Sequence, residues 1–162
     1  MDKLTQKYCL VTFIGHVKEG FEYVPNEAPL HVTIVDVFAT PLTAEQLLNQ
    51  LVNLIKLYEP VMTIAQQDAQ FGPDKQTLVT LLEMKPELIA LHKGLVTSLR
   101  ATGAVYNDPH YIEDGFVAHV TAIGGSKILA GDKVAIGELS LIDMFPDQNG
   151  YLRKVIKTIK IT

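Results

Sequence analysis

Residues 30–35 (Leu-His-Val-Thr-Ile-Val) and residues 118–123 (Ala-His-Val-Thr-Ala-Ile) read almost alike, and each carries a His-Val-Thr triplet. Both stretches are apolar and rich in β-branched residues, which is typical of strands. In a strand, residues i and i+2 project from the same face, so each triplet presents an imidazole beside a hydroxyl while its valine faces the core. A single short motif is weak, but two copies indicate a duplicated functional element. The pair predicts a cleft lined by His31, Thr33, His119 and Thr121.

Two imidazoles and two hydroxyls in one cleft suit the cleavage of a phosphodiester without a metal ion. A neutral histidine can take a proton from the attacking water or from a neighbouring ribose hydroxyl, while a protonated histidine gives one to the leaving oxygen. The threonine hydroxyls can donate hydrogen bonds to the non-bridging phosphate oxygens, where charge builds in the transition state. An ordinary histidine pKa of ~6.5 allows both protonation states near neutral pH. The sequence leaves open which histidine is the acid and which is the base.

With its paired His-x-Thr strands, one in each half, the chain resembles the 2H phosphoesterase superfamily. That superfamily includes the bacterial 2′-5′ RNA ligase-like and RNA 2′,3′-cyclic phosphodiesterase-like proteins, and the resemblance covers nearly the whole chain. It implies a bilobal, pseudo-twofold fold with the active site in the cleft between the lobes. It also implies that His31, Thr33, His119 and Thr121 form the catalytic tetrad. The chain has only two arginines, Arg100 and Arg153, which departs from the RNA-processing members and argues against long RNA substrates and ligase activity.

The rest of the chain predicts an α+β fold of mainly antiparallel sheet, with two main helices on the outside. One helix begins at a capping box of Thr43 and Gln46 and stops at Pro60. A second runs from near Pro86 to Ala101. Strands are expected over residues 8–15, 30–38, 61–71, 76–84, 116–123, 133–145 and 151–161. No flexible linker interrupts the sequence, so residues 1–162 are expected to form one domain of two closely packed lobes.

Composition narrows the class of protein and of ligand. Of the 162 residues, 48% are hydrophobic, enough for a folded core, and no apolar run approaches the ~18 residues of a membrane span. The single cysteine, Cys9, excludes an internal disulfide. A formal net charge of −4 favours a small phosphate ligand over a long nucleic-acid duplex. With no secretory signal, the chain is expected to be cytoplasmic.

Further residues are candidates for substrate binding, each with an alternative structural role. Aromatic side chains can stack on a nucleobase, although Phe116 fits the core better. His110 stands in a polar loop before the second motif, and Lys127 follows a Gly-Gly-Ser turn that could meet a phosphate. Arg153 begins the last strand, where a cation could reach the cleft or discourage edge pairing. The candidate contacts are His110, Tyr111, Lys127, Tyr151 and Arg153.

No pair of histidines has a spacing typical of metal ligands, so neither a metal ion nor a cofactor is expected. The leading hypothesis is hydrolysis of a 2′,3′-cyclic phosphate or a similar small nucleotide phosphodiester. An enzymatic alternative is cleavage of 2′-5′-linked or cyclic oligonucleotides. A catalytically silent nucleotide- or RNA-binding module and a purely structural partner protein are the non-enzymatic alternatives. The sequence leaves the oligomeric state open.

Overall fold

The computed structural model describes residues 6–162, which form two helices and ten strands. The helices are α1 (Ala44–Ile55) and α2 (Pro86–Ala101). Four short 3-10 turns, at Pro25–Glu27, Pro109–Tyr111, Glu113–Gly115 and Pro146–Gln148, lie in the loops. The strands are β1 (Lys7–Phe13), β2 (Glu22–Tyr23), β3 (His31–Ala39), β4 (Val61–Phe71), β5 (Thr77–Leu82), β6 (Val105–Tyr106), β7 (His119–Thr121), β8 (Lys133–Ile136), β9 (Glu138–Asp143) and β10 (Arg153–Lys160).

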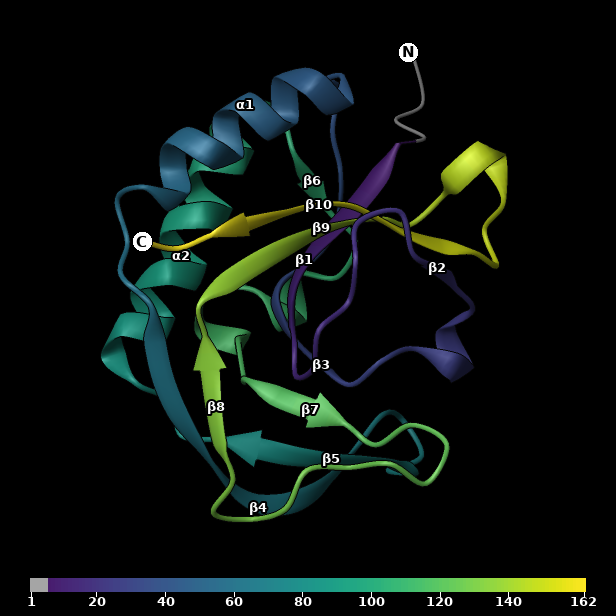
Figure 1. The fold of residues 1–162 in the computed structure, drawn as a ribbon, viewed down its shortest axis with the longest axis vertical. Helices are drawn as coiled ribbons and strands as arrows, with labels where there is room; N and C mark the ends of the chain where they lie inside the picture. Colours follow the sequence, from purple (N-terminus) through teal and green to yellow (C-terminus); the bar gives the residue numbers. More distant parts are fainter. Residues whose placement is uncertain (1–5) are drawn as a thin grey trace.

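The strands form one open antiparallel sheet in the order β2-β10-β9-β1-β3-β7-β5-β4-β8, with β6 paired to β3. In this order β2, β10, β9, β1 and β3 lie on one side of the β3–β7 contact, and β7, β5, β4 and β8 lie on the other. Figure 1 shows β1, β9 and β10 in the upper half of the molecule and β4, β5 and β7 in the lower half. The α+β class and the two-part antiparallel sheet predicted from the sequence are confirmed, and β3 and β7 meet at the centre.

Both helices begin where the sequence predicted. Thr43 caps α1 and forms a capping box with Gln46, so two otherwise unpaired backbone N–H groups are satisfied. α1 packs against β10 and α2 against β3. Gly94, in the middle of α2, has no side chain to keep the ring of Tyr58 away, and a Cβ there would lie 1.7 Å from the tyrosine oxygen. No helix in residues 6–162 has the length and apolar character needed to cross a bilayer.

The core consists of one large apolar cluster beneath the helices and a smaller one between β1, β9 and β10. The smaller cluster contains Cys9, which is 7% exposed. Burial raises the pKa of its thiol to about 12, so the side chain stays protonated. Cys9 is thus a buried small hydrophobic residue of the core.

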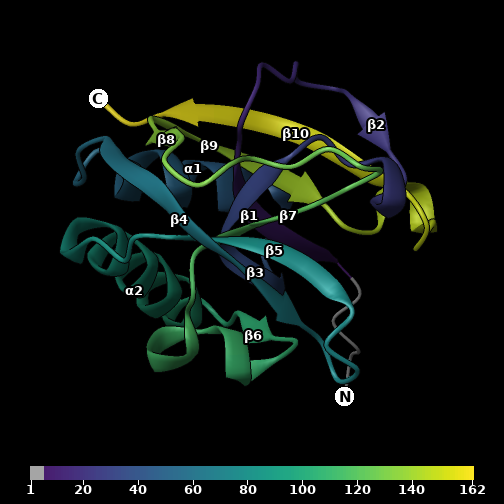
Figure 2. The same cartoon turned by 90° about the horizontal axis from the view of Figure 1, so that it is seen from below.

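Several predicted boundaries were wrong. The expected strand 133–145 is two strands, because the chain leaves β4 at Gly137 and crosses to pair with β1 and β10. The expected strand 116–123 shortens to the three residues of β7. The short strands β2 and β6 were not predicted: β2 pairs with β10 at one edge of the sheet, and β6 pairs with the end of the central strand β3. Figure 2 shows the segment around β6 beside α2.

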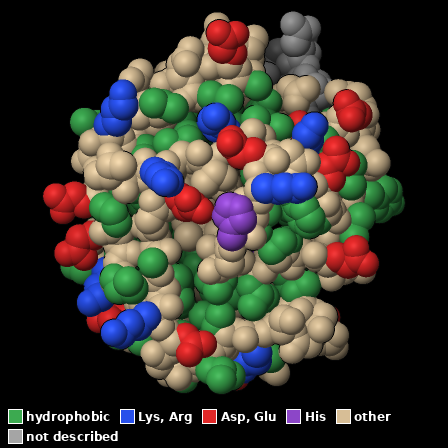
Figure 3. Space-filling view, viewed as in Figure 1, with side chains coloured by type: hydrophobic (Ala, Val, Ile, Leu, Met, Phe, Trp, Pro, Cys, Tyr) green, Lys and Arg blue, Asp and Glu red, His purple; other side chains and the backbone are tan. Residues whose placement is uncertain are grey.

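Acidic and basic side chains are interleaved on the surface. On the face shown in Figure 3, Lys and Arg residues stand among Asp and Glu residues and form no continuous basic stripe. The lysines of β10 follow this pattern, because Lys154 lies 4.0 Å from Glu22 and Lys157 lies 3.5 Å from Glu19. The lysine-rich end of the sequence is therefore partly neutralised by its neighbours.

Candidate active site

The two His-Val-Thr triplets pair with each other at the centre of the sheet. Val32 of β3 is the antiparallel partner of Val120 of β7. Both valines are buried, at 0% and 1% exposed, and face the core. Because the strands are antiparallel and the two valines pair, each histidine lies across from the threonine of the other triplet. All four of these side chains project from the face of the sheet that points away from the valines. The structure brings together the four half-buried side chains singled out in the sequence, His31, Thr33, His119 and Thr121.

The flanking strands repeat the same symmetry. β1 and β5 each carry a Leu-Val-Thr segment, at residues 10–12 and 78–80. Val11 pairs with Thr33 on one side, and Val79 pairs with Thr121 on the other. This second repeat was visible in the sequence and was missed there. Together the repeats show that the two halves of the site are built from equivalent strands.

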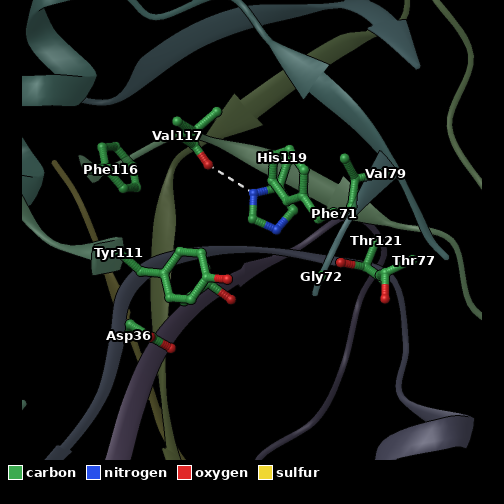
Figure 4. Close-up of a pocket in the computed structure, with 11 residues that line it drawn as sticks. Asp36, Phe71, Gly72, Thr77, Val79, Tyr111, Phe116, Val117, His119 and Thr121 are labelled. Atoms are coloured by element: carbon green, nitrogen blue, oxygen red, sulfur yellow. Dashed lines mark hydrogen bonds between the residues drawn. The ribbon is translucent and has the colours of Figure 1, made fainter. Parts of the chain in front are cut away.

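Both histidines are held by the same backbone contact. Nδ1 of His31 donates to the carbonyl oxygen of Pro29 at 2.8 Å, and Nδ1 of His119 donates to that of Val117 at 2.7 Å. A carbonyl oxygen only accepts, so each Nδ1 carries a proton. Figure 4 shows the His119 imidazole with Nδ1 turned to Val117. Nε2 of each ring is thus left to exchange a proton with a ligand.

An aromatic edge packs against each imidazole. Phe13 lies 6.0 Å from the His31 ring, and Phe71 lies 4.9 Å from the His119 ring, both at an interplanar angle of 71°. Burial lowers the pKa of His31 below its ordinary value, and the nearby His119 lowers it further, against the hydrogen bond to Pro29. His31 therefore favours its neutral form at pH 7, as a general base requires.

The four side chains border two adjoining cavities. One, of about 270 Å³, contains His119 and Thr121 together with Phe71, Tyr111 and Phe116. The other, of about 220 Å³, contains His31 beside Tyr23 and Arg153. Thr33 and Asp36 line both. The cavities therefore adjoin at these two residues of β3, and we refer to them together as the cleft. In Figure 4, Asp36 and Tyr111 lie on one side of the first cavity, and Val79, Thr77 and Thr121 lie on the other.

Asp36 was not predicted as a site residue. Irregular pairing between β1 and β3 interrupts the alternation of β3, so Ile34 and Val35 are both buried. The extra residue turns Asp36 to the same side as Thr33. The sequence signal that could have identified Asp36 is that it is the single acidic residue in the apolar stretch 30–38. Burial raises the pKa of its carboxyl group, with opposing effects from the Val37 backbone and from His119.

Only two of the five further candidate contacts lie in the cleft. Tyr111 lines the first cavity and Arg153 the second. Lys127 instead forms an ion pair with Asp68. Asp68 also accepts a hydrogen bond from Thr80, on the face of the sheet opposite the two histidines. The remaining two lie elsewhere on the surface: His110 is held by Asp108 beside a different hollow, and Tyr151 is 84% exposed in the β9–β10 turn.

A buried histidine fixes one wall of the cleft. His92 of α2 donates from Nδ1 to the Ile34 carbonyl oxygen at 2.7 Å and accepts at Nε2 from the Glu113 N–H at 2.8 Å. Its ring stacks on Phe116 at 3.9 Å. Glu113 has a φ of 56°, which is unfavourable for a residue with a side chain. His92 thus ties β3 to the loop that carries Tyr111.

The comparisons with known proteins agree with this geometry. No protein-family model and no curated protein sequence matches the chain. A crystal structure of a phosphoesterase has a TM-score of 0.60 and 17% identity, covering 97% of this chain and 98% of that one. E. coli LigT complexed with 3′-AMP has a TM-score of 0.59 and 14% identity, covering 97% and 98%. The chain has a LigT-like fold.

A further structure has the same LigT-like fold. The protein TT0787 of Thermus thermophilus has a TM-score of 0.59 and 14% identity, covering 96% of this chain and 97% of that one. The LigT-like fold therefore accounts for nearly the whole chain, and the resemblance expected from the paired triplets is confirmed for the fold. Among residues 6–162, no group of three or more His, Cys, Asp or Glu side chains is placed to hold a metal ion.

Proposed function

We propose that the chain is a phosphodiesterase that hydrolyses a 2′,3′-cyclic phosphate or a similar small nucleotide phosphodiester by two-histidine acid–base catalysis. The observation that carries the proposal is the pairing of Val32 with Val120, because it sets two imidazoles and two hydroxyls on one face of the sheet. The matching Nδ1 contacts of His31 and His119 support it, since they leave Nε2 of each ring available.

The proposed reaction begins with water approaching the phosphorus atom. Neutral His31 takes a proton from the water at Nε2, since burial keeps its pKa low. The new oxygen–phosphorus bond forms as the bond to one ribose oxygen breaks, and protonated His119 gives that oxygen a proton from Nε2. Thr33 and Thr121 donate hydrogen bonds to the non-bridging oxygens as their charge grows. The product is a nucleoside monophosphate in which the released ribose oxygen is a hydroxyl group.

The size and charge of the cleft support a small nucleotide substrate. LigT has been crystallised with 3′-AMP, with NADP+ and with ATP, so nucleotides bind a protein with this fold. In the present chain Phe71 and Tyr111 offer aromatic surface for a base. The interleaved surface charges give little attraction for a long nucleic-acid duplex.

The experiment is a turnover assay with the four nucleoside 2′,3′-cyclic phosphates at pH 7 in EDTA. We expect monophosphate product from the wild type, and kcat/KM values about 10²- to 10⁴-fold lower in His31→Gln and His119→Gln, because each removes a proton-transfer group. His16→Gln is the matched control, since His16 is exposed and lies outside the cavities that hold the two triplets.

Unchanged turnover in both cleft variants would contradict the proposal. If product formed only from 2′-5′-linked or cyclic oligonucleotides, the two-histidine mechanism would stand, and the substrate class would be these larger molecules. Tight nucleotide binding without product at any pH would indicate a binding module instead of an enzyme.

A further inference from the structure

Asp36 lies where the two cavities adjoin, and within residues 6–162 it has no side-chain partner. It is half-buried, and together with Thr33 it lines both cavities. In the described part of the chain its carboxylate forms no ion pair, and the hydrogen bond that lowers its pKa comes from the backbone of Val37. A half-buried carboxylate without a cationic partner is unfavourable for stability. Its position in the cleft therefore calls for a role toward the ligand.

The first cavity offers nothing to neutralise a second anionic group. Among its described lining residues there is no lysine or arginine, and its ionisable side chains are His119, Asp36 and Tyr111. Lys127, which follows the second triplet in sequence, is paired with Asp68 on the other face of the sheet. In the neighbouring cavity, Nη1 of Arg153 is directed to the carbonyl oxygens of Met144, Gly150 and Leu152.

The walls around Asp36 fit a neutral, partly aromatic group. Phe71, Tyr111 and Phe116 line the cavity, and Figure 4 shows Tyr111 and Asp36 on the same side of it. A carboxylate only accepts hydrogen bonds, so it suits a group that carries hydroxyl or amino donors. The same carboxylate repels a phosphate, and the repulsion is strong where few water molecules screen it.

We propose that Asp36 is a specificity-determining residue that admits ligands with one phosphate group, held between the histidines, and disfavours ligands with a second phosphate. This rests on the proposed function for the position of the first phosphate. The ligand class is then a nucleoside carrying a single phosphate group, with its uncharged hydroxyl- and amino-bearing part in the cavity of Asp36 and Tyr111. Nucleotides with additional phosphates bind more weakly.

The test is a binding measurement that needs no turnover. Dissociation constants for 3′-AMP and for adenosine 3′,5′-bisphosphate are measured by titration calorimetry at pH 7.5 and low salt. The wild type is expected to bind 3′-AMP about tenfold more tightly than the bisphosphate, because the carboxylate of Asp36 repels the second phosphate. Asp36→Asn, which keeps the shape and removes the charge, is expected to reduce this preference to less than about twofold, mainly through tighter binding of the bisphosphate.

Two further variants control for folding and for net charge. Asp36→Ser is expected to lose the preference in the same way. Glu59→Gln makes the same change in net charge at an exposed position away from the cleft and is expected to keep the wild-type preference. An unchanged preference in both Asp36 variants, or no binding of 3′-AMP to the wild type, would overturn the inference.

The two experiments distinguish a failure of the role of Asp36 from a failure of the proposed function. Turnover of a cyclic phosphate together with a preference that Asp36→Asn does not change would keep the phosphodiesterase and remove the role of Asp36. A preference that depends on Asp36 in a protein without turnover would keep the inference and remove the enzyme.

Discussion

The two halves of the site carry the same triplet in different surroundings. His31 belongs to a nine-residue strand, adjoins Tyr23 and Arg153, and has its pKa lowered by burial. His119 belongs to a three-residue strand and adjoins Phe71 and Asp36, in the cavity that offers space for a nucleoside. The local geometry of the two imidazoles is the same, but their environments differ. In the mechanism that we propose, these environments assign the base to His31 and the acid to His119.

The largest expected effect comes from removing either histidine. Each single change to glutamine is expected to reduce kcat by about 10²- to 10⁴-fold, because proton transfer at one end of the reaction is lost. The double variant His31→Gln/His119→Gln is expected to be no worse than the poorer single variant, since groups that act in one step are not additive. Single-turnover measurements check this, and losses that multiply would show that the histidines act independently.

The threonines are expected to have the next largest effect. Thr33→Val and Thr121→Val keep the shape of the side chain and remove the hydroxyl that donates to a non-bridging phosphate oxygen. We expect kcat to fall by about 10- to 10³-fold in each, with a smaller change in KM, because the hydrogen bond strengthens in the transition state. Steady-state kinetics measure the two effects. A rise in KM alone would assign the hydroxyls to ground-state binding.

The scaffold around Glu113 is expected to depend on His92. His92→Leu leaves the Ile34 carbonyl and the Glu113 N–H without partners, which is expected to cost about 2–5 kcal/mol of unfolding free energy. Burial lowers the pKa of His92 in the folded protein, so the unfolded chain binds a proton more readily. The free energy of unfolding therefore decreases as the pH falls below ~6.5. In urea unfolding from pH 5 to 8, the free energy of unfolding is expected to change less with pH in the variant than in the wild type. Some pH dependence remains in the variant, because the pKa of His31 is also lowered by burial. Equal slopes would contradict the role of His92.

The smallest expected effect compares the two Leu-Val-Thr repeats. Thr12 donates to the Glu138 carbonyl oxygen at 2.7 Å, whereas Thr80 reaches the Ile128 carbonyl oxygen at 3.3 Å. Thr12→Val is therefore expected to cost about 1 kcal/mol of unfolding free energy, because it removes a short, buried hydrogen bond. Thr80→Val is expected to cost less than Thr12→Val. The reverse order in chemical denaturation would show that the two halves do not differ in this way.

Local signals in the sequence predicted both helices, most of the strands and the four central side chains. The Thr43 capping box, the helix ending at Ala101 and the alternation within the His-Val-Thr triplets depend on neighbouring residues, so the sequence carries them directly. The position of Asp36 depends on irregular pairing with another strand. The removal of Lys127 from the cleft depends on Asp68, far away in the sequence. Such long-range contacts have no local pattern and were not predictable.

The most direct test of the two-histidine mechanism is the pH dependence of kcat/KM in EDTA for the wild type, His31→Gln and His119→Gln. The wild type is expected to give a bell-shaped profile whose acidic limb has a midpoint below ~6.5, because burial lowers the pKa of His31. His31→Gln is expected to remove the acidic limb, and His119→Gln the alkaline one. The same profile in all three proteins, or wild-type activity that EDTA abolishes, would contradict the mechanism.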